Sequence, residues 1–188
     1  MNVRKLALTS TAIIALSSIS AGSALADTTT GTATAVVVQA AVVTLATDPS
    51  FGTLNVTAAG TAVLAPGGGV TTTGGYTASG IPSQGVANIT TSSGSVDIAV
   101  TLADLAPTGT AAGTLHAVGL SVTGGAAPIT GTAPTGAASV TAAVVGDNLG
   151  GAGTTAATLN IGASVDDGGT APGADTYQGA LTVTVNNN

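Results

Sequence analysis

His116 is the one histidine of the chain and the first candidate for acid–base chemistry near neutral pH. A Ser–His–Asp site would need it, together with a serine and backbone oxyanion donors. No Gly-x-Ser-x-Gly elbow surrounds any serine, and the densest serine cluster, residues 92–95, has the composition of a turn before a strand. His116 itself falls in the alternation of an expected strand. The pattern predicts that the protein is not an enzyme.

Carboxylates are the second group that could do chemistry. Asp166 and Asp167 are adjacent, but they lie in a glycine-rich stretch, where we expect solvated loop residues rather than the paired acids of a glycosidase. Loop carboxylates also suit Ca²⁺, although no EF-hand spacing connects them. We therefore expect no cofactor, and keep a structural Ca²⁺ ion as the alternative to plain turn caps. Its candidate ligands are Asp147, Asp166, Asp167 and Asp175.

The charge of the chain excludes several classes of function. Only 5% of the 188 residues are charged, and the two cations, Arg4 and Lys5, stand at the N-terminus. A body without lysine or arginine cannot neutralise phosphates, so nucleic acid is not an expected partner. The chain has 0 cysteines, which excludes disulfides and thiolate metal sites.

Residues 1–26 have the pattern of a cleaved signal peptide. Arg4 and Lys5 precede an apolar stretch, and Ala24-Leu25-Ala26 forms a small-x-small cleavage site. The apolar stretch is too short and too interrupted by serine for a membrane span. We expect an exported bacterial protein of residues 27–188, with no membrane span, in the periplasm, on the cell surface or outside the cell.

Apolar residues in the mature part alternate with a period of two, which indicates half-buried strands. In 95–102 the inward face would be Val96, Ile98, Val100 and Leu102. The pattern predicts an all-β, antiparallel sandwich or barrel in one domain, residues 27–188. The predicted strands are 53–56, 62–64, 86–91, 95–102, 115–122 (with His116, Val118, Leu120 and Val122 on one face), 139–145, 157–161 and 176–185. The predicted turns lie at 66–69, 74–75, 124–125, 146–148, 150–151 and 167–169.

The run 33–45 is the strongest β-forming segment of the mature chain and contains no charge, proline or glycine. It supports two interpretations. One is a central strand buried on both faces. The other is a donor strand, within 27–45, that inserts into a neighbouring subunit. Its apolar residues include Val36, Val37, Val38, Val42 and Val43.

Three stretches carry a resemblance to a known family. These are Asp48-Pro49-Ser50-Phe51-Gly52-Thr53-Leu54, then Thr158-Leu159-Asn160-Ile161-Gly162, and a C-terminal "PG…YxGxLxVxV" ending that runs from Pro172 through Tyr177, Gly179, Leu181, Val183 and Val185. Together they resemble the secreted bacterial family catalogued as domain of unknown function 4402. More distantly, they are similar to the spore coat protein U domain and to chaperone–usher pilins. The resemblance implies an exported immunoglobulin-like β-sandwich that polymerises on the cell surface.

The same residues have structural roles that can be expected from their chemistry. Phe51, the only phenylalanine, should anchor the base of the core, and Gly52 should allow a turn where a Cβ would clash. Tyr177 should start the last strand on its inward face, with its hydroxyl bonded to backbone upstream.

The functional expectation is an exported structural subunit, pilin-like or coat-like, that assembles by β-strand addition. Residues 33–45 would be the donor or first strand and 177–185 the closing or acceptor-edge strand. Its partners would be copies of itself or other pilus or coat subunits, and a periplasmic chaperone. The alternative is a monomeric adhesin-like or carbohydrate-binding sandwich whose acidic loops hold Ca²⁺.

Overall fold

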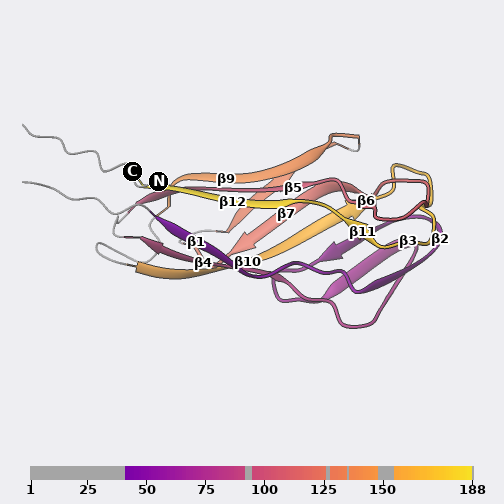
Figure 1. The fold of residues 1–188 in the computed structure, drawn as a ribbon, viewed down its shortest axis with the longest axis horizontal. Coiled ribbons are helices and arrows are strands. Elements are labelled where there is room, and N and C mark those ends of the chain that lie inside the picture. The colour runs from indigo at the N-terminus through magenta and orange to yellow at the C-terminus, as the bar shows by residue number, and fades with distance from the viewer. Residues whose placement is uncertain (1–40, 92–94, 126–127, 135, 148–154, 188) are drawn as a thin grey trace, which may run out of the picture. The chain divides into compact units, whose positions relative to one another are not determined.

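The computed structural model describes residues 41–91, 95–125, 128–134, 136–147 and 155–187 (Figure 1). The chain divides into two units, 1–38 and 39–188, and all described residues belong to the second. Every regular element among them is a strand, and every ladder is antiparallel. The strands are β1 (Val42–Thr47), β2 (Thr53–Leu64), β3 (Val70–Ser79), β4 (Gly85–Thr91), β5 (Val96–Ala103), β6 (Ala106–Pro107), β7 (His116–Thr123), β8 (Ile129–Thr132), β9 (Ser139–Asp147), β10 (Thr155–Asp166), β11 (Tyr177–Gln178) and β12 (Leu181–Asn187).

The strands form two main sheets that face each other, so the predicted all-β, antiparallel sandwich is confirmed. The larger sheet has the order β1-β4-β10-β2-β3, with β7 on the other side of β10 and β8 beyond it. The smaller sheet has the order β12-β5-β9, and β6 with β11 forms a short separate ribbon. Figure 1 shows β12, β5 and β9 in one layer and β1, β4 and β10 in the other.

The core between the sheets is built from small and medium aliphatic side chains. Strand β5 contributes its predicted inward row, in which Val96 and Val100 are 0% exposed. Opposite it, β10 contributes Leu159 and Ile161, both fully buried. Regular alternation of β-branched residues explains why these segments form strands that each bury one face.

Most predicted strands are present, with shifted ends. Residues 53–56 and 62–64 belong to one long strand, β2, and the prediction missed β3, β6 and β8. The predicted turn at 74–75 is wrong, because both glycines lie inside β3. Gly74 has a φ of 66°, next to an irregularity in the β2–β3 ladder between Val56 and Gly60. A β-bulge can accommodate two glycines within a strand. The alternation of apolar residues along the sequence does not reveal such a bulge.

Two further expectations about strand faces are corrected. A register shift between Ser164 and Val165 moves β7 by one residue, so Ala117 is buried and His116 is half-exposed. His116 therefore does not share the buried face of Leu120 and Val122. The predicted strand 176–185 is interrupted at Gly179, and Tyr177 lies on β11 rather than at the start of the last strand.

One side of the sandwich is closed by the two sheets themselves. Strand β8 of the larger sheet lies against β9 of the smaller sheet. At Gly131 the two backbones approach so closely that a Cβ would overlap the carbonyl oxygen of Thr141. A glycine is required there because any side chain would force the two edges apart.

We expect Gly131→Ala to lower the free energy of unfolding by about 1–3 kcal/mol, the cost of overpacking a site that cannot relax. Urea unfolding measures the change. The control is Gly67→Ala, because a Cβ at Gly67 would meet nothing within 4 Å. Equal stability of the two variants would contradict the close approach of β8 and β9.

Candidate functional site

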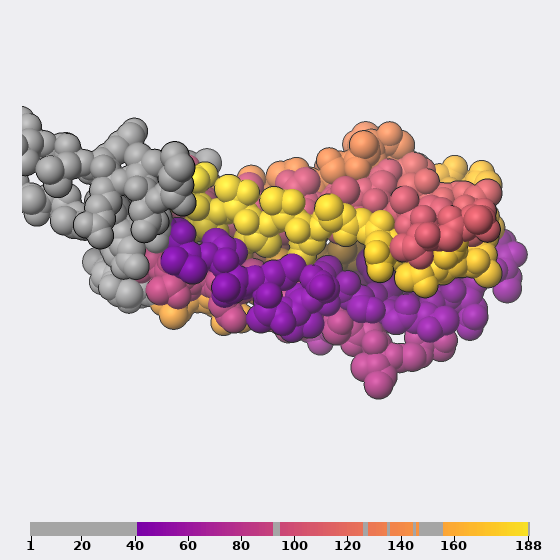
Figure 2. Space-filling view, viewed as in Figure 1, coloured from indigo at the N-terminus to yellow at the C-terminus, as the bar shows by residue number. Residues whose placement is uncertain are grey.

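The opposite side of the sandwich is not closed in this way. There β1 of the larger sheet and β12 of the smaller sheet run beside each other, as the indigo and yellow segments in Figures 1 and 2 show. Among the described residues, the only ladder partner of β1 is β4 and the only ladder partner of β12 is β5. Two sheet edges therefore lie side by side, and we call this strip, with the hollows at its end, the β1–β12 groove.

The floor of this groove is apolar and only partly covered. Leu181, Val183 and Val185 point from β12 toward the main core cluster, yet each is half-buried. The adjacent β5 row has the same alternation and is 0–4% exposed. The difference arises because no strand covers β12 from the far side in the described part of the chain. Completing this row would remove further apolar surface from water, which is favourable at about 25 cal/mol per Å².

Strand β1 forms the other side of the groove. Its position contradicts the interpretation of the run 33–45 as a central strand. From Val42 onward the run is an edge strand, not a central one: Val42 is 52% and Leu45 is 42% exposed. Val43 alone of its residues packs against the core cluster. Residues 42–47 thus belong to this chain's own sandwich, whereas Val36, Val37 and Val38 lie outside the described residues.

The groove widens into two hollows toward the end of the sandwich where β12 begins. The first has a volume of about 490 Å³ and lies between Pro49–Phe51 and Tyr177–Leu181, with Leu102 and Leu105 in its lining. The second, of about 540 Å³, is lined by the start of β2 and by the segment 172–177. There the β2 residues Thr53–Val56 pair only with β3, among the described residues. An extended chain could therefore find unpaired strand edge along both β12 and β2.

Phe51 and Tyr177 line both hollows. Phe51 is half-buried and packs against both apolar clusters, so it joins them rather than lying sealed inside one. The expected turn at Gly52 is confirmed, because its φ is 71° and a Cβ would lie 2.8 Å from the carbonyl oxygen of Ser79. The Tyr177 hydroxyl donates to the carbonyl oxygen of Gly173 at 2.9 Å, as the tyrosine-corner expectation required.

Gly179 separates β11 from β12 for a steric reason. A Cβ at this position would lie 2.6 Å from the carbonyl oxygen of Ala103. The chain therefore passes directly over the end of β5 before β12 begins at Leu181. This crossing sets the position of β12 at the groove.

Asp175 holds the wall of the second hollow in place. One carboxylate oxygen accepts the backbone N–H groups of Gly109 at 3.0 Å and Ala111 at 3.2 Å, and the other accepts that of Thr176 at 2.7 Å. These bonds, with Thr176 first and Ala111 next, hold the pKa of Asp175 below its usual range. Asp175 thus connects the segment 172–177 to the loop after β6.

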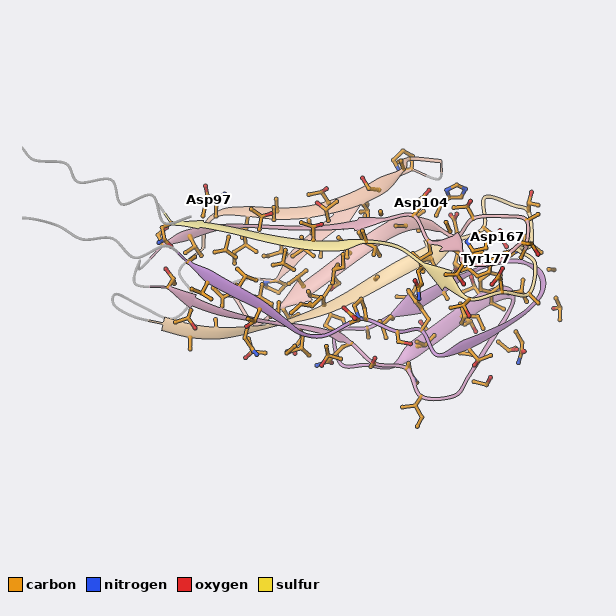
Figure 3. The ribbon with its side chains drawn as sticks, viewed as in Figure 1. Asp97, Asp104, Asp167 and Tyr177 are labelled. Atoms are coloured by element: carbon orange, nitrogen blue, oxygen red, sulfur yellow. The ribbon has the colours of Figure 1, made fainter. Side chains whose placement is uncertain are left out.

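A buried pair, Tyr76 and Asp167, was not anticipated from the sequence, and Figure 3 shows its carboxylate member Asp167 at this same end of the sandwich. Asp167, 5% exposed, accepts the hydroxyl of Tyr76 at 3.1 Å and the N–H groups of Gly60 and Gly169. Burial, and then the bond to Asp167, raise the pKa of Tyr76 well above its ordinary value. The signal that could have found it is Tyr76 itself, one of 2 tyrosines in a chain with few aromatics.

His116 also has a carboxylate partner that the sequence analysis did not identify. Its Nδ1 lies 2.7 Å from Oδ2 of Asp104, and Oδ1 of Asp104 accepts the N–H of Ala117 at 2.8 Å. Asp104 follows one predicted strand and His116 begins the next, so the connection between them could have suggested the pair. The arrangement fixes the imidazole and ties β7 to the end of β5.

The calcium candidates are dispersed over different turns. Asp166 accepts the N–H of Gly168, while Asp167 and Asp175 have the partners given above. Asp147 ends β9, and its side chain is outside what the structure describes. Within the described residues, no three histidine, aspartate or glutamate side chains converge as metal ligands.

Comparisons of the chain with models of protein families, with curated proteins and with solved structures gave no match. No helix in the described ranges is long and apolar enough to cross a membrane. The function therefore has to be argued from the geometry of the groove.

The Tyr76–Asp167 pair predicts an alkaline loss of stability. The pKa of Tyr76 is raised by folding, so its contribution is complete below the unfolded value of about 10 and is lost as the pH rises toward the folded value. Tyr76→Phe should cost about 1.5–3 kcal/mol at neutral pH, as expected for a hydrogen bond to a charged group, and should flatten the alkaline loss. Urea unfolding from about pH 8 to 11 measures both.

Tyr177→Phe is the control for this experiment. Burial and the nearby Asp175 raise the pKa of Tyr177 too, but this residue is less buried than Tyr76. The Tyr177 variant should keep the larger part of the alkaline loss. If it alone flattened the pH dependence, Asp167 would not be coupled to Tyr76.

Asp175→Asn should loosen the segment 172–177. Because the pKa of Asp175 is lowered by folding, its contribution is present above the unfolded value of about 4 and is lost as the pH falls through the lower folded value. At neutral pH the variant should show faster amide hydrogen exchange at Gly109 and Ala111. Asp48→Asn, at another exposed aspartate, should leave these amides unchanged. Unchanged exchange in the Asp175 variant would show that the carboxylate does not hold the segment.

Proposed function

We propose that this protein is an exported structural subunit that assembles by β-strand addition, and that the β1–β12 groove accepts a strand from a second copy. The observation that carries the proposal is the half-covered row of Leu181, Val183 and Val185 beside a sheet edge. An added strand supplies both things that this edge needs, main-chain hydrogen bonds and apolar cover. The geometry favours a polypeptide partner because a small ligand would leave most of the edge unpaired.

The donor is the segment 27–41 of the neighbouring copy. Residues 28–47 contain no charged side chain, and Val36, Val37 and Val38 give the segment a strongly apolar centre. Fifteen residues in extended conformation reach about 50 Å, whereas a seven-residue strand such as β12 spans about 24 Å. The donor is thus long enough to pair with β12 and to continue into the first hollow.

A neighbouring copy is favoured over the chain's own groove by turn chemistry. Strand β1 begins at Val42, so the preceding residues could return along the groove only through a tight reversal close to 38–41. Such reversals need glycine, asparagine, aspartate or proline, and 33–45 contains none of them. The run instead favours a continuous extended segment that leaves its own domain.

Export and chaperoning belong to the same proposal. Residues 1–26 act as the signal peptide, and the mature subunit carries an incomplete apolar row until a donor strand arrives. Exposed strand edges of this kind promote non-specific association, so a periplasmic chaperone would hold the groove before assembly. The finished polymer forms a pilus-like or coat-like layer at the bacterial surface.

Deletion of residues 27–41 from the mature protein should abolish polymers and leave a folded or chaperone-dependent monomer, because β1 begins only at Val42. Size-exclusion chromatography and negative-stain microscopy measure assembly. A synthetic peptide of residues 27–41 should bind the truncated protein and raise its melting temperature, since the ligand binds only the folded state. Identical polymers from the truncated protein would overturn the proposal.

Because side chains alternate between the two faces of a strand, two variant peptides can serve as controls for each other. One carries Val36→Asp with Val38→Asp, and the other carries Val37→Asp. In a strand these positions face opposite sides, so one peptide places its charge in the groove and the other places it in solvent. We expect one peptide to lose binding and the other to retain it. Equal behaviour of both would rule out strand addition as the mode of binding.

A further inference from the structure

The edge strands of the described sandwich differ in what lies beside them. On one side β8 lies against β9, and on the other β1 and β12 border the groove. Strand β3 is the remaining edge of the larger sheet, and its only ladder partner among the described residues is β2. With 10 residues it is also the longest of these edges. No described strand lies beside the outer N–H and C=O groups of β3.

Proteins usually protect such an edge, and β3 has few of the usual devices. Residues 53–79, which include β2 and β3, contain no charged side chain, and β3 contains no proline. The irregularity at Gly74 interrupts the ladder but leaves a regular four-residue part, Val70–Thr73, paired with Thr61–Leu64. Thr71 and Thr73 are exposed on one face of this part, and Thr72 is half-buried on the other.

The chemistry of the partner follows from charge. The chain has 8 acidic residues against 2 cations, both of which precede the mature part, so two mature copies repel each other over most of their surfaces. The β2–β3 ribbon itself carries no charged side chain, and Asp166 and Asp167 border it only on the β10 side of β2. A neutral backbone edge can pair there with an identical edge without adding like charges.

We propose that β3 is a second assembly interface, at which two copies pair edge to edge around a two-fold axis. Residues that are directly opposite in an antiparallel pair point to the same face. The two-fold axis must therefore pass through a residue, and within Val70–Thr73 we place it at Thr72. Thr72 then faces Thr72 of the second copy, and Thr71 lies opposite Thr73. The two larger sheets become one continuous sheet across the pair. Because β3 and β1 stand at opposite ends of the strand order of the larger sheet, this interface joins subunits or fibres laterally.

A cysteine variant tests the register. The chain has 0 cysteines, so Thr72→Cys introduces a single thiol. Two such thiols lie across the two-fold axis at a separation that suits a disulfide. Mild oxidation of the mature protein should convert most of it to a disulfide-linked dimer. Thr184→Cys, at an exposed position on β12, is the control. Equal dimer formation by both variants would overturn the proposed register.

A charge pair tests the interface itself. Thr71→Asp with Thr73→Asp places like charges opposite each other and should abolish lateral pairing. Thr71→Lys with Thr73→Asp places Lys opposite Asp and should preserve it, although the two double variants differ only at position 71. Sedimentation and negative-stain microscopy measure the pairing. Retained pairing in the Asp–Asp variant, or its loss in both, would overturn the proposal.

The two assembly modes give separable results. Single fibres that persist in the Asp–Asp variant support strand addition at the groove together with lateral pairing at β3. Failure of the donor-segment experiments would leave the Thr72→Cys crosslink unaffected, because β3 does not contribute to the groove.

Discussion

Backbone hydrogen bonding between strands is the interaction on which the rest of this structure depends. Residues 27–188 contain no lysine or arginine with which carboxylates could form ion pairs, and few aromatic side chains are present to enlarge the core. Ladders between strands must therefore hold each sheet together, and the packing of Val, Ile, Leu and Ala must hold the two sheets against each other. In such a protein, a strand edge without a ladder partner lacks the backbone hydrogen bonds and the apolar cover that stabilise the other strands.

Aspartate side chains form hydrogen bonds with the backbone instead of ion pairs with lysine or arginine. Asp167, Asp175 and Asp104 each accept backbone N–H groups, and together they connect loops at the end of the sandwich where the hollows lie. Figure 3 shows Asp104, Asp167 and Tyr177 toward this end, with Asp97 toward the other. A carboxylate that accepts several N–H groups is satisfied without a counter-ion. The segment 172–177, which lines the second hollow, is thus held by such bonds from Asp175.

The asymmetry between the two sides of the sandwich links the structure to the proposed assembly. At β8 and β9 the two sheet edges meet through Gly131, and that side is complete within one chain. At β1 and β12 the edges border an apolar row that is still half-covered. Closure on one side and incompleteness on the other are what a subunit needs if it is to join a neighbour in one direction and still fold by itself.

The sequence by itself determined the class of fold and the composition of the core, because alternation in segments such as 95–102 depends only on neighbouring residues. It also indicated the turn at Gly52 and the hydroxyl bond of Tyr177, which are local features. Only the tertiary structure decided that β1 is an edge, that His116 shifts out of the buried face, and that Tyr76 meets Asp167. Each of these depends on ladder register and on which strands become neighbours, and residues far apart in the chain set both.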